Sequence, residues 1–177
     1  MFTRVCIVAA TVAALTGLST SDASAQLVVR GIAGTASEAE YGFGFGGSVG
    51  FYLPTGKKNL FVGARGVYHT GEERSEGLNV TENGQLLFGL EFGSAFITKP
   101  IIIRSVGWLG VASQSTKTLT GGSVVSKLTD NKFLFGPGLL VAIPIGSFRI
   151  GVEPRYLRVF GGKSSFVVYG SLGLNIN

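Results

Sequence analysis

The sequence is poor in cysteine and in charged residues. Its 177 residues include one cysteine, Cys6, and only 14% are charged. If the first 25 residues are removed, no thiol remains, which excludes disulfides and cysteine metal sites. There is also no uninterrupted apolar run of 18 residues, so a membrane-spanning helix is excluded. Yet 45% of the residues are apolar and 28 are glycine, a composition that suits apolar residues spread thinly along many strands.

The first 25 residues have the pattern of a cleaved export signal. Arg4 is followed by an apolar stretch over Val5–Leu18, and Ala23-Ser24-Ala25 has the small-x-small form that signal peptidase accepts. Cys6 lies too early for a lipid-attachment site. We therefore predict a signal peptide over residues 1–25 and one domain over residues 26–177.

After Gln26, strand-like runs alternate with turn-rich breaks. A strand that spans a membrane needs about 9–11 residues, and each run is long enough. No helical period occurs among them. Pro137 lacks a backbone donor and predicts a bulge or bend in the sixth run. We expect eight strands, at Gln26–Thr35, Tyr41–Leu53, Asn59–His69, Gly84–Ile97, Ile101–Gln114, Lys132–Ile143, Ser147–Phe160 and Ser164–Asn177.

The two faces of these runs differ in a way that indicates a membrane. In the fourth run, one face carries Leu86, Phe88 and Leu90, and the other face carries the intervening residues, among them Gly89 and Glu91. A water-soluble sandwich would solvate the second face with many charges, but here it is mostly glycine, serine and alanine. Such a face suits a narrow lumen, and the apolar face suits lipid. We therefore predict an all-β fold, an eight-stranded antiparallel up-and-down transmembrane barrel.

The breaks and the aromatic residues predict the orientation of this barrel. The second, fourth and sixth breaks are short, whereas the third (Thr70–Asn83) and the fifth (Ser115–Asn131) are long and polar. Bacterial barrels have short periplasmic turns and longer outer loops, with aromatic girdles at both interfaces. We expect both termini in the periplasm. The aromatic residues expected to face outward are Phe43, Phe51, Tyr68, Phe88, Phe96, Phe148, Tyr156 and Phe166.

With its eight alternating strands, glycine-rich lumen positions and unequal connections, the chain resembles the small outer-membrane β-barrels of the OmpA transmembrane-domain and OmpX type. The resemblance covers residues 26–177 and rests on architecture, so it assigns no site residues. It implies a bacterial outer-membrane location. The chain departs from these families at its end, where Ile176-Asn177 stands in place of the usual terminal aromatic residue.

The charged residues predicted to face the lumen are few. Charges inside an eight-stranded barrel are costly unless they are paired, because side chains fill such an interior. We predict a structural ion-pair network that closes the lumen, rather than a gated ion pathway. Its members are Arg65, Glu91, Arg149, Glu153 and Arg155, with Arg30 and Arg104 as further candidates.

Two other functions compete with a plugged structural or surface-interaction barrel. The first is a carrier of small hydrophobic molecules, similar to OmpW, with a lumen pocket lined by Ile102, Trp108, Leu134 and Leu140. The second is an enzyme that modifies lipid A, which would need a serine and an acid beside a histidine on the barrel. The only histidine, His69, precedes Thr70 and Glu72 at a break. We expect His69 at the rim of an acidic outer loop and no catalytic residue.

No cofactor or metal ion is predicted. The glycine run at Gly42–Gly47 is followed by no helix, so it is not a nucleotide loop, and one histidine beside flexible acids is a weak metal site. The fifth break is basic, with Lys117, Lys127 and Lys132, and anionic lipopolysaccharide is its expected partner. Outer-membrane lipid and the barrel assembly machinery are the other expected partners. We expect a monomer that binds no nucleic acid.

Overall fold

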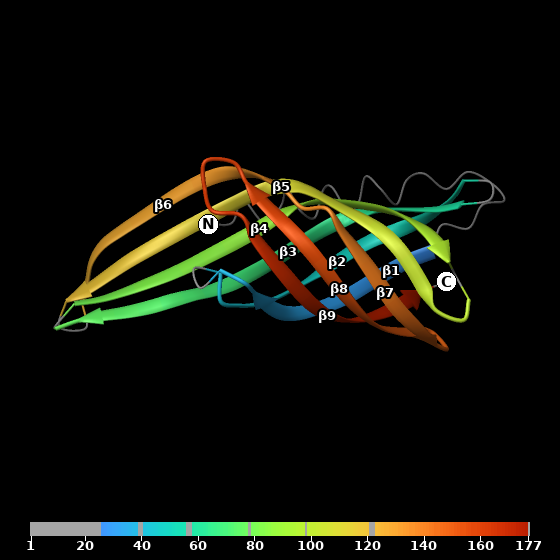
Figure 1. Cartoon of the computed structure of the whole chain (residues 1–177), viewed down its shortest axis with the longest axis horizontal. Helices are drawn as coiled ribbons and strands as arrows, with labels where there is room; N and C mark the ends of the chain where they lie inside the picture. Colours follow the sequence, from blue (N-terminus) through green and yellow to red (C-terminus); the bar gives the residue numbers. More distant parts are fainter. Residues whose placement is uncertain are drawn as a thin grey trace.

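The computed structural model describes residues 26–38, 41–55, 58–77, 79–97, 99–120 and 123–176, and the predicted signal peptide lies outside them. These residues form one antiparallel sheet (Figure 1). Among the described residues no helix is long and apolar enough to cross a membrane. The strands are β1 (Gln26–Ala36), β2 (Phe43–Thr55), β3 (Lys58–Glu76), β4 (Asn79–Ile97), β5 (Ile102–Thr120), β6 (Ser123–Phe135), β7 (Gly138–Ile145), β8 (Phe148–Val159) and β9 (Ser165–Ile176).

The sheet closes on itself. Each strand pairs with its neighbour in the chain from β1 to β6, β7 pairs with both β5 and β8, and β1 pairs with β9 over ten residue pairs from Leu27↔Ile176 to Ala36↔Val167. In a closed sheet every strand has a neighbour on both sides, so the ladder hydrogen bonds satisfy the backbone groups without solvent. The predicted barrel is therefore confirmed.

The described residues form nine strands where eight were predicted, because the sixth predicted strand is divided between β6 and β7. The two are separated at Gly136 and Pro137, where the sequence predicted a bulge or bend. Pro137 has no N–H for the ladder. Gly136 keeps the wall continuous, since its N–H and C=O both bond to Trp108 of β5, at 2.8 and 3.0 Å. Together β6 and β7 make one passage along the wall.

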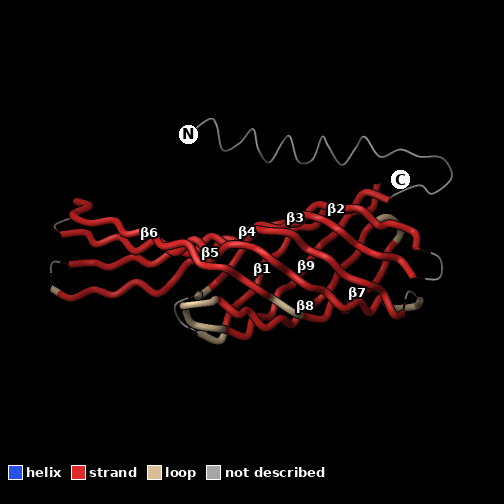
Figure 2. Tube along the Cα trace, turned by 90° about the horizontal axis from the view of Figure 1, so that it is seen from above, coloured by secondary structure: helices blue, strands red, loops and turns tan. Residues whose placement is uncertain are grey.

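The prediction of two long outer loops is also wrong. Most of Thr70–Asn83 and Ser115–Asn131 continues as strand, with β3 running to Glu76 and β5 to Thr120. Figure 2 shows the β3–β4 and β5–β6 hairpins reaching well past the rest of the barrel at one end. They are joined side by side, because β4 and β5 stay paired as far as Asn79↔Thr120. We call the four strands beyond the barrel the projecting sheet.

The projecting sheet is strand rather than loop because alternating threonine, valine and leucine favour extended backbone even among polar residues. Cross-strand side-chain bonds on one face add to this preference: Thr116 Oγ1 donates to Asn83 (3.0 Å) and Thr120 Oγ1 donates to Asn79 (2.6 Å). Polarity alone had suggested loops, but the strand period continues through these segments.

The predicted alternation of faces is confirmed by burial. Of the aromatic residues expected to face outward, all are exposed except Phe51, which is half-buried. Leu90 in the fourth predicted strand is 59% exposed, whereas its neighbour Glu91 is 0% exposed. The barrel therefore has apolar side chains outside and charged side chains inside, the reverse of a water-soluble protein. We call the outward apolar surface the lipid-facing band.

Candidate functional site in the barrel lumen

The middle of the lumen holds a cluster of charged side chains that is closed to solvent. Glutamates from β4 and β8 meet arginines from β1, β3 and β8, so the cluster crosses the barrel rather than following one strand. All members are at most 5% exposed. We call this group the ion cluster; it consists of Arg30, Arg65, Glu91, Glu153 and Arg155.

Each glutamate of the ion cluster accepts hydrogen bonds from three arginines. Glu153 Oε1 accepts from Arg65 Nη1 at 2.6 Å and from Arg155 Nε at 2.9 Å, and Glu153 Oε2 accepts from Arg30 Nη1 at 3.4 Å. Glu91 accepts from the same three arginines, with Arg30 Nη2 on Oε2 and Arg65 Nη1 on Oε1 at 3.3 Å. Both carboxylates thus bridge several guanidinium groups, an arrangement that offsets part of the cost of burying these charges.

Aromatic rings cover the remaining surface of these guanidinium groups. Arg65 lies 5.0 Å from the Trp108 ring centre and 4.8 Å from that of Tyr169, and Arg155 lies 5.7 Å from that of Trp108. Arg155 also donates to the carbonyl of Gly136 at 2.6 Å, at the break between β6 and β7. The bend at Pro137 therefore positions a carbonyl acceptor for the ion cluster.

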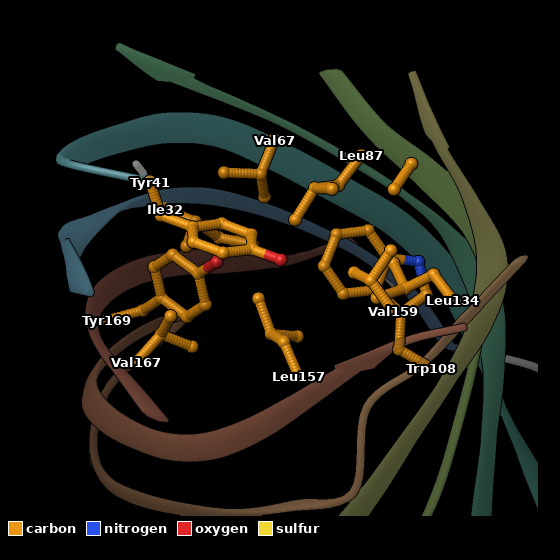
Figure 3. Close-up of a cluster of buried hydrophobic side chains, with 11 residues drawn as sticks. Ile32, Tyr41, Val67, Leu87, Trp108, Leu134, Leu157, Val159, Val167 and Tyr169 are labelled. Atoms are coloured by element: carbon orange, nitrogen blue, oxygen red, sulfur yellow. The ribbon is translucent and has the colours of Figure 1, made fainter. Parts of the chain in front are cut away.

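Toward the projecting sheet, the lumen is filled by buried aromatic and aliphatic side chains (Figure 3). His69 lies in this part of the lumen. The prediction that it lies at the rim of an outer loop is wrong, because His69 is within β3 and is 0% exposed. Its Nε2 is 2.8 Å from the Tyr169 hydroxyl and its Nδ1 is 3.0 Å from the Tyr41 carbonyl. A Cβ at Gly44 would lie 2.5 Å from the ring, so glycine there makes the space. The period of β3, which places His69 on the same face as Arg65 and Val67, could have revealed its burial.

The four residues of the predicted carrier pocket do not line one pocket. Trp108 and Leu134 pack in the cluster of Figure 3, whereas Ile102 and Leu140 pack in a separate cluster with Val106 and Ala142. All four side chains are buried, but they lie in two separate clusters, and of the four only Ile102 and Leu140 line the small recess described below. The structure therefore corrects the expectation of a single hydrophobic pocket.

Toward the short turns, the lumen holds a different polar group. Arg104 of β5 and Arg149 of β8 each donate from Nη1 to the Tyr52 hydroxyl of β2, both at 2.6 Å. Arg149 was expected in the ion network, but in the described residues it pairs with Tyr52 and has no ion pair with Glu91 or Glu153. Arg30, a further candidate for that network, joins it instead. We call Tyr52, Arg104 and Arg149 the arginine–tyrosine site.

The outer face of the projecting sheet carries a row of charges across four strands. Glu73 of β3 lies opposite Glu82 of β4, Glu82 opposite Lys117 of β5, and Lys117 opposite Lys127 of β6. Lys132 lies nearer the barrel, 3.2 Å from Asp130. The row is acidic at β3 and basic at β6. Apart from this row, apolar side chains of β6 are exposed, among them Val125 at 66% and Leu128 at 70%.

Solved structures share this fold at low sequence identity. A major outer membrane protein of Thermus thermophilus matches with a TM-score of 0.62 and 11% identity, over 86% of this chain and all of that one. The N-terminal β-barrel domain of OprF from Pseudomonas aeruginosa gives 0.56 and 13%, over 88% and 100%. Ail of Yersinia pestis, solved in complex with the heparin analogue sucrose octasulfate, gives 0.51 and 15%, over 85% and 97%.

This chain has the fold of small outer-membrane β-barrels. No family model and no curated protein sequence matches it. The likeness therefore concerns architecture, and it agrees with the resemblance drawn from the strand pattern.

Proposed function

We propose that this chain is a non-enzymatic integral protein of the bacterial outer membrane, with a plugged lumen and a projecting sheet that makes contacts at the cell surface. One observation carries the proposal: large apolar side chains cover the outside of the barrel, while the charges of the ion cluster are buried inside. Lipid is the solvent that stabilises such an inverted barrel. The three similar structures, one of which is named a major outer membrane protein and another a β-barrel domain, support it.

The proposed orientation places both termini in the periplasm. The chain ends at the end of the barrel that carries the short turns β2–β3, β4–β5 and β7–β8 (Figure 1). The projecting sheet leaves the opposite end, as the long outer segments of bacterial barrels do. In intact cells, externally added protease should then cut within the projecting sheet and leave the short turns uncut.

A matched pair of substitutions tests whether lipid covers the barrel. Leu90 and Val125 are both exposed, at 59% and 66%, but Leu90 lies in the lipid-facing band and Val125 in the projecting sheet. An arginine on the lipid face near the membrane centre costs about 2–4 kcal/mol. In liposomes, we expect Leu90→Arg to lower the free energy of unfolding by this amount, and Val125→Arg to change it by at most about 0.5 kcal/mol. Equal effects of the two substitutions would contradict the proposed membrane location.

The lumen proposal has its own measurement. Because the ion cluster and the packed side chains of Figure 3 fill the barrel, planar bilayers that contain the refolded protein should show no steady conductance. Replacing Leu87 and Trp108 together with alanine would remove two fully buried side chains and should raise conductance above the wild-type value. Steady open channels in the wild-type protein would contradict a plugged lumen.

We further propose that the protein is a monomer and that lipopolysaccharide is one of its partners at the cell surface. Lys117 and Lys127 lie side by side on the outer face of the projecting sheet, and basic side chains near a membrane attract anionic headgroups. Changing both to serine should weaken lipopolysaccharide binding in calorimetry severalfold, whereas Glu73→Gln should not weaken it. Wild-type binding by the double variant would exclude this contact while leaving the barrel proposal intact.

A further inference from the structure

The arginine–tyrosine site contains buried positive charge without a buried acid beside it. Arg104 is 0% exposed, and Arg149 is half-buried. Within the described part of the chain, neither guanidinium forms an ion pair, because Glu91 and Glu153 are held by Arg30, Arg65 and Arg155. A buried charge is stable only when it is paired or coordinated.

The ion cluster cannot supply the missing negative charge. Among the described residues, the buried charged side chains are four arginines and two glutamates, and each glutamate already contacts three arginines. Aromatic rings help, since Arg104 lies 4.5 Å from the Phe61 ring centre and 5.2 Å from that of Tyr52. Such contacts are worth about 1–2 kcal/mol, well short of neutralising a buried charge.

Several donors of the site have no protein acceptor. Nε and Nη2 of Arg104 and Nε of Arg149 are buried and make no hydrogen bond to any described residue. The Tyr52 oxygen accepts from both arginines, so its own proton is directed elsewhere and can be donated. Three side chains from β2, β5 and β8 therefore bring more donors to one place than the Tyr52 oxygen can accept from.

These side chains line a recess at the end of the barrel that carries the short turns. Its polar wall includes Tyr52, Arg104 and Arg149, its apolar wall includes Ile102 and Leu140, and Gly173 makes part of its floor. A Cβ at Gly173 would lie 3.0 Å from Cγ of Arg30, so the glycine at this position leaves space in the recess. The recess has room for about one water-sized particle, so a small anion fits it better than a phosphate ester does.

We propose that the arginine–tyrosine site binds one halide-sized anion, in practice chloride, held by the Arg104 and Arg149 guanidinium groups and the Tyr52 hydroxyl. The anion supplies the charge that the protein does not, in a recess that opens toward the short turns. The site does not depend on the membrane location, the surface contact or the plugged state of the lumen proposed above.

Chloride binding can be measured on the protein refolded in zwitterionic detergent. At constant ionic strength, with sodium gluconate replaced stepwise by sodium chloride, wild-type protein should broaden the ³⁵Cl resonance, and bromide should reverse this broadening. The urea midpoint should rise with chloride over the same range, because a ligand that binds only the folded state stabilises it. Folded wild-type protein without broadening and without a chloride-dependent midpoint would overturn the proposal.

Variants locate the site. Tyr52→Phe keeps the ring and removes the donor, Arg149→Met keeps the side-chain volume and removes the charge, and both should reduce the broadening severalfold. Arg158→Met, which removes an exposed arginine of the same strand as Arg149, should leave it unchanged. If Arg158→Met lowers the broadening as much as Tyr52→Phe and Arg149→Met do, the anion binds at the surface and the proposal is wrong.

Crystals soaked in bromide give a second readout that needs no variant. Anomalous scattering should show one bromide within hydrogen-bond distance of Arg104 and Arg149. Bromide found elsewhere, with none in this recess, would overturn the assignment even if chloride stabilised the protein in solution.

Discussion

The middle of the lumen and its end near the short turns use the same residue type in opposite ways. In the ion cluster, three arginines share two glutamates, and Arg65 Nη1 lies 2.6 Å from Glu153 Oε1. At the arginine–tyrosine site, two arginines share a neutral hydroxyl. Among the described residues, both regions keep some buried guanidinium N–H groups without a hydrogen bond. Only the first region has carboxylates that offset its positive charge, and a buried guanidinium without such a partner is suited to binding an anion.

The largest expected effect comes from unpairing the ion cluster. Glu153→Gln keeps the side-chain volume but leaves three buried arginines with one carboxylate. We expect the free energy of unfolding in detergent, measured with urea, to fall by about 3–5 kcal/mol. The control Glu82→Gln removes an exposed charge and should cost less than about 1 kcal/mol. Equal losses would mean that the buried carboxylate of Glu153 stabilises the protein no more than an exposed one does, and would contradict the role of the ion cluster.

A pair of arginine substitutions sharpens the comparison directly. Arg65→Met removes the partner that Glu153 holds at 2.6 Å and should cost about 2–3 kcal/mol, the value of a charged hydrogen bond in a buried site. Arg104→Met removes a charge without a carboxylate partner, so its lost contacts with Tyr52 and Phe61 are offset by relief of desolvation. In chloride-free buffer we expect a change within about 1 kcal/mol. A greater loss for Arg104→Met than for Arg65→Met would reverse the comparison.

In the third region of the lumen, around His69, a substitution should lower the free energy of unfolding less than one in the ion cluster does. Tyr169→Phe removes the hydroxyl that contacts His69 Nε2 and keeps the ring against Arg65. We expect a loss of about 1–2 kcal/mol in urea unfolding, because a buried polar atom loses its partner. Tyr68→Phe, on the exposed face, is the matched control and should change stability by less than about 0.5 kcal/mol. A result for Tyr169→Phe no larger than this control would show that the contact adds nothing to stability.

The smallest effect is expected where a glycine adjoins both regions. Gly173 lines the recess and lies against Arg30 of the ion cluster, so the methyl group of Gly173→Ala should push on that arginine and cost about 1 kcal/mol. Gly31→Ala adds the same methyl group on the outer face, with no atom closer than 4.0 Å, and should stabilise by about 0.5 kcal/mol. A gain in stability from Gly173→Ala would show that Arg30 has room to move.

Much of the wall and its facing could be predicted from the sequence. Alternation with a period of two placed Leu90 outside and Glu91 inside, because a strand can point neighbouring side chains only to opposite faces. The same rule, had it been continued past the polar positions, would have carried β3 to Glu76 and buried His69. The loops were mispredicted because composition was weighed above period.

The partners of the inward-facing side chains could not be predicted from the sequence. Alternation states that Arg30, Arg104 and Arg149 face the lumen, but it does not state at which height along the barrel or opposite which strand. These depend on the stagger between β1 and β9 and on the bend at Pro137, which are properties of the closed sheet. The sequence by itself determined which side chains lie inside, since strand geometry is local. Only the tertiary structure decided that one group of arginines meets glutamates and another meets Tyr52, since those distances arise when the barrel closes.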